Sequence, residues 1–245
     1  MQELPPISIV VPALNEEKYI SVLLNSLCKI NHEMEVVVVD AHSDDTTVEV
    51  VESFRSKLCH KPLTIINSDV RFIAKQRNAG ARAAKHDLIL FCDADIEFPS
   101  SEEFEKIISE FVGGDYGIAT SRIAALGNET KADRLYYIAY LTQRLMAIFG
   151  RIMASGNFIL VRKDIFEKVG GFDETLRISE DVDFSLRAAK HCRFKLFSVP
   201  IRVSTRRAQK YGYKWIKENP KALYKLLVKG RLTEEDNVFY PFGDF

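Results

Sequence analysis

The sequence lacks the features that mark several large classes of protein. Its 4 cysteines are scattered along 245 residues with no Cys-x-x-Cys pair, which disfavours a zinc site and a secreted disulfide framework. Neither Gly-x-Gly-x-x-Gly nor Gly-x-x-x-x-Gly-Lys-Ser/Thr occurs, so a dinucleotide fold or a P-loop would have to work without its phosphate-binding loop. No stretch reaches the ~18 apolar residues of a membrane-spanning helix, and the first residues lack the layout of a signal peptide. We therefore expect a cytoplasmic protein, or one that lies at the cytoplasmic face of a membrane.

The chain also has no excess of charge of either sign. It contains 34 basic and 34 acidic residues, so bulk charge gives no reason to expect a nucleic-acid partner. The distribution is uneven, because Lys and Arg recur with apolar residues between them over 206–231, where Glu218 is the only acid. Such a segment is either a solvated face packed on its own domain or a helix docked on anionic lipid. The sequence leaves both interpretations open.

Composition is that of an ordinary globular protein. With 47% hydrophobic residues, 28% charged residues, 12 glycines and 8 prolines, the chain can bury a full core. Strands and helices are expected to alternate along the first half: strands over 7–12, 35–40, 63–67 and 88–91, and helices over 19–27, 48–58 and 72–85. This alternation predicts β-α-β crossovers and a parallel sheet.

Acidic side chains follow three of the expected strands. The apolar run 88–91 leads to Asp93 and Asp95, and Glu16 and Asp40 follow two other strands. Ligands bind just beyond the carboxyl ends of parallel strands, and adjacent carboxylates there repel each other unless a cation or a ligand compensates them. Asp also ends strands in ordinary turns. Three acidic strand ends nevertheless favour a nucleotide diphosphate compound, whose phosphates a divalent cation would bridge to the protein.

The second half of the chain is expected to contain further helices and strands. Ser100 and Glu103 have the spacing of a capping box before a helix over 104–111. The apolar stretch 134–153 is predicted to be a buried helix, with an acceptor-binding or membrane-facing helix as the alternative. Further strands are expected over 116–123, 154–162 and 196–203. A helix beginning near Glu180 has acids in its first turn, which suit the helix dipole by themselves.

Four stretches of the first half together resemble the N-terminal half of the family-2 glycosyltransferases, which have the GT-A fold. They are Val11–Glu17, Val39–Thr46, Arg77–Gly80 and Asp93–Asp95. The side chains that this resemblance places near a ribose and base are Glu16, Asp40, Arg77 and Asn78. It also makes Asp93-Ala94-Asp95 the Asp-x-Asp motif, in which Asp95 binds Mg²⁺ or Mn²⁺ and Asp93 faces the ribose.

The second half continues the resemblance, in the order Gly156–Arg162, Gly170–Asp173 and Glu180–Arg187. In inverting members of the family, the aspartate of the Glu-Asp pair is the general base. This role maps to Asp181, with Glu180 as its neighbour and Asp183 as the rival by position. A sugar hydroxyl is a poor nucleophile and needs a positioned base.

The chain departs from the family pattern in two places. Many relatives carry a histidine that completes the metal shell, and here Ser204 and Thr205 stand in its place. Either Asp95 and water suffice or metal dependence is weaker, and Arg206 and Arg207 could then meet the diphosphate. The Gln-x-x-Arg-Trp motif of processive synthases is missing, which predicts the addition of one sugar per event.

We therefore expect an α/β protein with the GT-A fold. A Rossmann-like nucleotide-binding half with a mostly parallel central sheet covers 1–98, a smaller acceptor-binding half covers 99–203, and a basic amphipathic segment covers 204–245. The expected substrate-binding residues are Pro12, Asn15, Glu16, Asp40, Arg77, Asn78, Asp93, Ala94, Gly156, Arg206 and Arg207. The expected catalytic residues are Asp181 and Glu180, and the metal ligand is Asp95.

The expected reaction moves one sugar, with inversion, from a UDP- or GDP-linked sugar to a glycan, a polyprenyl phosphate or a glycolipid. Mg²⁺ or Mn²⁺ is the expected cofactor. One alternative is a nucleotidylyltransferase, which would need a glycine-rich loop directly after the first strand. Another is a non-catalytic nucleotide-sugar-binding module, against which the intact Glu180-Asp181 pair argues.

Overall fold

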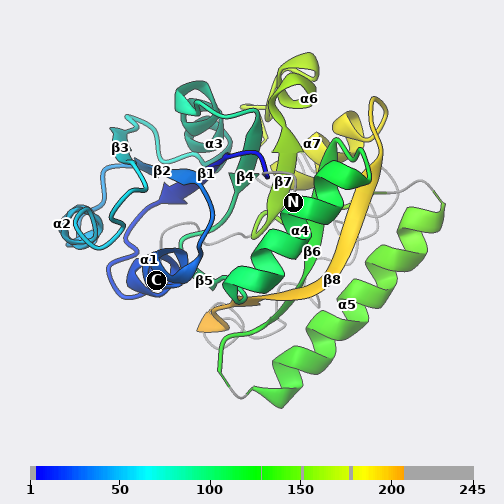
Figure 1. Cartoon of the computed structure of the whole chain (residues 1–245), viewed down its shortest axis with the longest axis horizontal. Helices are drawn as coiled ribbons and strands as arrows, with labels where there is room; N and C mark the ends of the chain where they lie inside the picture. The colour runs from blue at the N-terminus through cyan, green and yellow to red at the C-terminus, as the bar shows by residue number, and fades with distance from the viewer. Residues whose placement is uncertain (1–3, 128, 150–151, 177–178, 207–245) are drawn as a thin grey trace.

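The computed structural model describes residues 4–127, 129–149, 152–176 and 179–206. In this part of the chain, eight strands form one sheet in the order β3-β2-β1-β4-β7-β6-β8-β5 (Figure 1). The strands are β1 (Ile7–Ala13), β2 (Met34–Asp40), β3 (Leu63–Asn67), β4 (Leu88–Phe91), β5 (Ile96–Glu97), β6 (Ile118–Ala125), β7 (Ile159–Arg162) and β8 (Phe194–Val203). The helices are α1 (Ile20–Lys29), α2 (Thr47–Ser53), α3 (Ile73–Ala83), α4 (Ser101–Gly113), α5 (Thr130–Ile148), α6 (Lys163–Lys168) and α7 (Glu180–Ala188).

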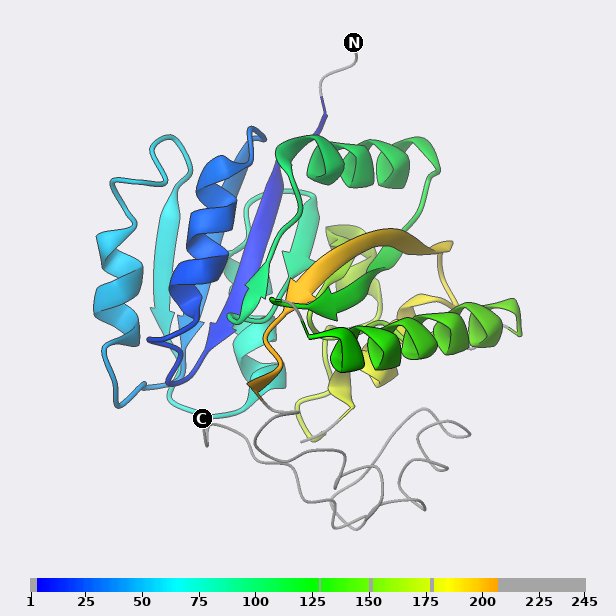
Figure 2. The same ribbon diagram turned by 90° about the horizontal axis from the view of Figure 1, so that it is seen from below.

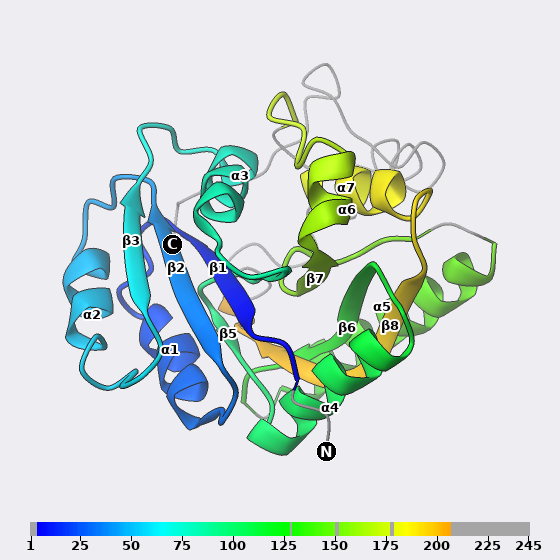
Figure 3. The same cartoon turned by 45° about the horizontal axis from the view of Figure 1, so that its top comes forward.

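The first half of the chain forms the parallel part of the sheet, as predicted. β1 pairs with β2 and β4, and β2 pairs with β3, all in parallel. Their carboxyl ends therefore meet at one edge, toward which the blue and cyan arrowheads point in Figure 2. α1 and α2 pack on one face of these strands and α3 on the other (Figure 3). Every residue of β1 and β2 is buried. Helices cover both faces of these strands, which explains why their sequences are rich in Val and Ile.

The second half adds strands of mixed direction. β7 runs antiparallel to both β4 and β6, β8 runs parallel to β6, and β5 runs antiparallel to β8. The predicted capping box is confirmed: Ser100 accepts a hydrogen bond from the Glu103 N–H at the start of α4, and the Glu103 side chain accepts one from the Ser100 N–H.

Helix α5 differs from its prediction. It covers Thr130–Ile148 instead of 134–153, and within it only Ala132 and Tyr140 are buried. The interpretation as a buried helix is therefore wrong: α5 packs against β6 along one side and leaves its other side on the outside of the molecule (Figure 2). None of the helices in the described residues is long and apolar enough to span a membrane.

Residues 207–245 lie outside the described residues. They include Arg207 and most of the predicted basic amphipathic segment.

Candidate functional site

Charged side chains gather where the carboxyl ends of β1, β2 and β4 meet the start of α7 and the chain that follows β8. They form two clusters. The Arg77 cluster consists of Arg77, Asp93, Gly156, Glu180 and Asp181. The Arg206 cluster consists of Glu16, Asp95 and Arg206.

Arg77 is the centre of the first cluster. It projects from α3 with 1% of its side chain exposed. Its Nη1 donates to Glu180 Oε1 at 2.6 Å, and its Nη2 donates to Asp93 Oδ1 at 3.1 Å and to the Gly156 carbonyl at 3.2 Å. A buried guanidinium with these partners compensates the charge of carboxylates that would otherwise repel each other.

The backbone at the start of α7 presents Asp181. Its Oδ2 accepts the Gly156 N–H and its Oδ1 accepts the Val182 N–H, each at 2.8 Å. Burial raises the pKa of Asp181 above its usual range, and the Arg77 charge and the two N–H donors offset part of this rise. Burial and the charge of Asp181 together raise the pKa of Glu180 to about 7.

The rival acid, Asp183, has a different environment. Its carboxylate accepts a hydrogen bond from Arg187 Nε at 2.8 Å on the next turn of the same helix, and the residue is buried. Arg187 also donates to the Val169 and Gly171 carbonyls. Asp183 therefore helps to anchor the loop after α6.

The Arg206 cluster joins residues from distant parts of the chain. Arg206 Nη2 lies 2.5 Å from Glu16 Oε1, and its Nε lies 3.1 Å from Asp95 Oδ2. The guanidinium carbon stands 4.4 Å from the centre of the Tyr19 ring, within the range of a cation–π contact. Burial raises the pKa of Glu16 to about 7, even though Arg206 acts to lower it.

Hydrogen bonds to Asp95 and Glu129 hold the chain before Arg206. Ser204 N–H donates to the Asp95 carbonyl at 3.0 Å, and Thr205 Oγ1 donates to Glu129 Oε1 at 2.7 Å, just ahead of α5. These contacts fix the backbone of this segment beside Asp95.

The loops that follow β1 and β2 are tied to each other. Asn15 N–H donates to Ser43 Oγ, Asp44 N–H donates to Asn15 Oδ1, and Glu16 N–H donates to Thr47 Oγ1. Asp40 accepts both the N–H and the hydroxyl of Ser43. Asn15 itself has a φ of +56°, a left-handed conformation that Asn tolerates better than most residues.

Several predicted site residues have protein partners. Asn78 Nδ2 donates to the Phe172 carbonyl and to Glu174 Oε1, and its Oδ1 accepts the Phe172 N–H. Pro12 lies within β1, and Ala94, between Asp93 and Asp95 in the sequence, is buried. Arg77 and Asn78 therefore make the framework that holds the acids and the 172–174 loop in place.

Two organising residues were not predicted. The buried amide of Gln76 donates to the carbonyls of Ala13 and Val39, which ties the ends of β1 and β2 together. Asn157 Nδ2 donates to Asp93 Oδ2 at 2.9 Å. Their only sequence signal is position, since Gln76 directly precedes Arg77-Asn78 and Asn157 directly follows Gly156.

The donor set of the Arg206 cluster fits a divalent cation that arrives with a phosphate ligand. Glu16 and Asp95 are buried carboxylates that already share one cationic partner. Among the described residues no three His, Cys, Asp or Glu side chains form a group that could hold a metal. Mg²⁺ typically takes one or two carboxylates together with substrate phosphates, so the phosphates would complete its coordination.

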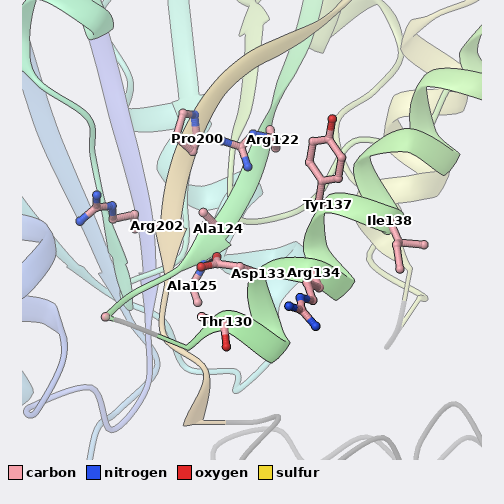
Figure 4. A pocket seen from close by; sticks show the side chains of 11 residues that line it. Arg122, Ala124, Ala125, Thr130, Asp133, Arg134, Tyr137, Ile138, Pro200 and Arg202 are labelled. Atoms are coloured by element: carbon pink, nitrogen blue, oxygen red, sulfur yellow. Dashed lines mark hydrogen bonds between the residues drawn. The ribbon is translucent and has the colours of Figure 1, made fainter.

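A separate cavity of about 900 Å³ lies between the N-terminal half of α5 and strands β6 and β8 (Figure 4). Tyr137 and Ile138 line it from the helix, and Pro200 lines it from β8. Asp133 Oδ1 accepts the Ala125 N–H at 2.7 Å, which fixes the start of the helix against β6.

A family model places the chain. The model described as "Glycosyl transferase family 2" matches residues 8–170, and the one described as "Glycosyltransferase like family 2" matches residues 120–222. Because the first match covers well over half of the chain, the protein belongs to glycosyl transferase family 2.

Individual relatives agree with this assignment. The chain is 42% identical over 91 residues to poly(ribitol-phosphate) beta-N-acetylglucosaminyltransferase TarS of Staphylococcus aureus. These aligned residues cover 36% of the chain and 16% of TarS. It is 26% identical over 243 residues to the uncharacterized glycosyltransferase EpsJ of Bacillus subtilis, which covers 94% of the chain and 66% of EpsJ. The chain thus spans only part of each relative.

Solved structures confirm the predicted GT-A fold. A crystal structure of S. aureus TarS 1–349 in complex with UDP matches with a TM-score of 0.67 at 24% identity, over 81% of this chain and 60% of that one. The mannosyltransferase PcManGT from Pyrobaculum calidifontis, in complex with GDP-Man and Mn²⁺, matches with a TM-score of 0.61 at 18% identity, over 81% of this chain and 56% of that one.

Proposed function

We propose that this protein transfers one sugar, with inversion, from a nucleotide diphosphate sugar to an acceptor hydroxyl. The observation that carries the proposal is the Asp181 carboxylate, which the Gly156 N–H holds within the Arg77 cluster at the carboxyl edge of the sheet. Family membership supports the reaction class. Residues 1–98 would bind the donor and residues 99–203 the acceptor.

In this proposal Asp181 is the general base. Its carboxylate takes the proton of the acceptor hydroxyl, and the oxygen forms a bond to the anomeric carbon of the sugar. The bond from that carbon to the diphosphate oxygen breaks, and the diphosphate leaves with the electron pair. The raised pKa of Asp181 suits the role, because a base works best when its pKa lies near the working pH.

The donor would bind across the loops after β1, β2 and β4. Glu16, Asp40 and Asp93 can accept hydrogen bonds from a ribose or base, and Pro12, Asn15 and Ala94 would form the surface around them. UDP in the TarS structure and GDP-Man in the PcManGT structure support a nucleoside diphosphate of one of these kinds. Arg77 and Gly156 would position Asp93 and Asp181, and Arg207 remains a predicted phosphate contact.

Asp95, with Glu16 nearby, would hold Mg²⁺ or Mn²⁺. The cation would supply positive charge to the leaving diphosphate, where negative charge develops. The Mn²⁺ bound by PcManGT supports this cofactor.

The acceptor side would face an anionic membrane that carries a lipid-linked acceptor. Among the described residues, every large exposed hydrophobic side chain except Val70 lies on α5 or directly after it. These are Leu135, Tyr137, Ile138, Leu141, Leu145, Ile148 and Phe149. The helix also carries Lys131, Arg134 and Arg144, while its one acid, Asp133, is bonded to the backbone of β6. Apolar and basic residues on one helix are typical of a surface that lies on anionic lipid.

The experiment that tests the function measures release of nucleoside diphosphate from UDP- and GDP-sugars with Mn²⁺, with water standing in for the acceptor. We expect Asp181→Asn to lower turnover by ~10²–10⁴-fold and to change the affinity for UDP or GDP by less than about 3-fold, since the base does not hold the nucleotide. Asp183→Asn is the matched control from the same helical turn, and it should lower the melting temperature but retain turnover.

Absence of any metal-dependent nucleoside diphosphate binding would overturn the proposal. The assignment of Asp181 as the general base would be wrong if Asp181→Asn kept full turnover while Asp183→Asn lost it. Binding without any turnover in the native protein would favour the non-catalytic module.

A further inference from the structure

An arginine of the chain itself pairs with the two carboxylates that would hold a divalent cation. The Arg206 guanidinium lies between Glu16 Oε1, at 2.5 Å, and Asp95 Oδ2, at 3.1 Å. All three side chains are buried, with 8% of Arg206, 10% of Glu16 and 5% of Asp95 exposed. Two buried carboxylates require a cation close by, and here Arg206 provides that charge.

We propose that Arg206 is a built-in counter-ion that competes with the divalent cation for Glu16 and Asp95, and that it exchanges these carboxylates for the diphosphate when donor and metal bind together. This inference rests on the proposed function, because it assigns Arg206 a role in loading the same donor site.

The charges of these side chains favour binding of metal together with a nucleoside diphosphate over binding of metal alone. Glu16 and Asp95 carry at most two negative charges and Arg206 carries one positive charge, so a divalent cation alone would bring the summed charge of these three side chains to at least +1, with two cations in contact. A diphosphate that arrives with the metal adds at least two negative charges. Metal and nucleoside diphosphate should therefore bind cooperatively, while the metal alone binds weakly.

The local structure allows such an exchange. Hydrogen bonds from Ser204 and Thr205 hold the backbone just before Arg206, so the side chain can turn without the segment leaving the site. The guanidinium packs over the Tyr19 ring, so rotation of the side chain away from Glu16 and Asp95 would change this contact. Its planar fork suits two phosphate oxygens at least as well as two separate carboxylates.

The test measures Mn²⁺ binding to the nucleotide-free protein, by electron paramagnetic resonance of free Mn²⁺, in the native chain and in Arg206→Gln. We expect Arg206→Gln to bind Mn²⁺ alone at least ~10-fold more tightly, because removal of one cation favours entry of another. UDP and GDP should meanwhile bind at least ~10-fold more weakly with Mn²⁺ present, through loss of a phosphate contact.

Three controls define the cause. Arg202→Gln, near the end of β8 with 61% of its side chain exposed, should leave Mn²⁺ affinity unchanged. Arg206→Lys keeps the charge and should stay within about 3-fold of the native Mn²⁺ affinity. Adding Asp95→Asn to Arg206→Gln should abolish the gain in Mn²⁺ affinity. Thermal unfolding of both variants checks that each of them is folded.

An unchanged or weaker Mn²⁺ affinity in folded Arg206→Gln would overturn the inference. If Mn²⁺ tightens but no variant binds UDP or GDP, the competition stands and the proposed function fails. If nucleotides bind and Mn²⁺ affinity does not respond to Arg206, only the inference fails.

Discussion

At the scale of single residues, burial determines how the acids at this edge titrate. Asp181 and Glu180 are neighbours at the start of α7, and burial raises the pKa of both. Arg77 opposes the rise, because its charge favours the ionised form of each acid.

This environment predicts an acid limb in the pH profile. In the proposed role as base, Asp181 must be ionised to accept a proton, so kcat/KM should fall as pH decreases, with an apparent pKa above that of an ordinary aspartate. The pKa of Glu180 is raised to about 7, partly by the charge of Asp181, so Glu180 is still protonated and neutral where Asp181 ionises. Glu180→Gln replaces one neutral group by another and should leave this limb at the same pH. A limb that Glu180→Gln displaces by more than about one pH unit, measured with saturating metal, would contradict the assignment.

The acids could be predicted as candidates because each follows an apolar strand or begins a helix in the local pattern. Their partners could not. Arg77 is separated by 103 residues from Glu180, and Arg206 is separated by 190 residues from Glu16. No local periodicity connects such positions, so the sequence associated Arg77 with the nucleotide and gave no sign that it joins Asp93 to Glu180.

At the scale of elements, the segment before β7 depends on a close approach of its backbone to the Arg77 side chain. Gly156 lies against Arg77, and a Cβ at this position would stand 2.5 Å from Arg77 Nη2. Arg77 cannot move aside at low cost, because it is buried and bonded to Asp93, Glu180 and the Gly156 carbonyl. A glycine is therefore required here for space.

Gly156→Ala should lower the free energy of unfolding by about 1–3 kcal/mol and should reduce turnover, since it displaces Arg77. The matched control is Gly113→Ala at the end of α4, where an added Cβ meets nothing within 4 Å and where stability should rise by up to about 1 kcal/mol. Denaturant unfolding and the turnover assay measure both effects. Equal stability of the two variants would contradict the packing argument.

Element type was easier to predict than element environment. β1 and β2 were predicted as strands of a parallel sheet, and both are buried throughout. Helix α5 was predicted from its apolar residues, but the prediction that it is buried was wrong, since only Ala132 and Tyr140 of this helix are buried. Apolar composition alone cannot show whether a helix meets the core or a surface outside the protein.

At the scale of the whole molecule, the apolar side of α5 is the most distinctive surface of the described residues. Ile148 and Phe149 are 78% and 73% exposed, and Ile138, Leu141 and Leu145 continue the same side at helical spacing. Exposed apolar patches of this kind mark sites of interaction.

The protein should therefore sediment with vesicles that contain anionic phosphatidylglycerol and much less with neutral phosphatidylcholine vesicles. Joint replacement of Ile138 and Leu145 by Ser should weaken this binding at least ~10-fold, because each large apolar side chain contributes ~1.5–3 kcal/mol when buried. Val70→Ser is the matched control, since Val70 is exposed away from α5. Unchanged sedimentation of the double variant would exclude α5 as the docking surface.

The tied loops after β1 and β2 have a consequence for how this edge can evolve. Neither loop has regular structure of its own, and each takes its shape from hydrogen bonds to the other, through Asn15, Ser43 and Thr47. Gln76 fastens the two strand ends beneath them. A substitution in one loop therefore alters the other as well, and effects of paired substitutions will not be additive. A new ligand preference at this edge would have to arise through linked changes in both loops, so single mutations there explore few functional alternatives.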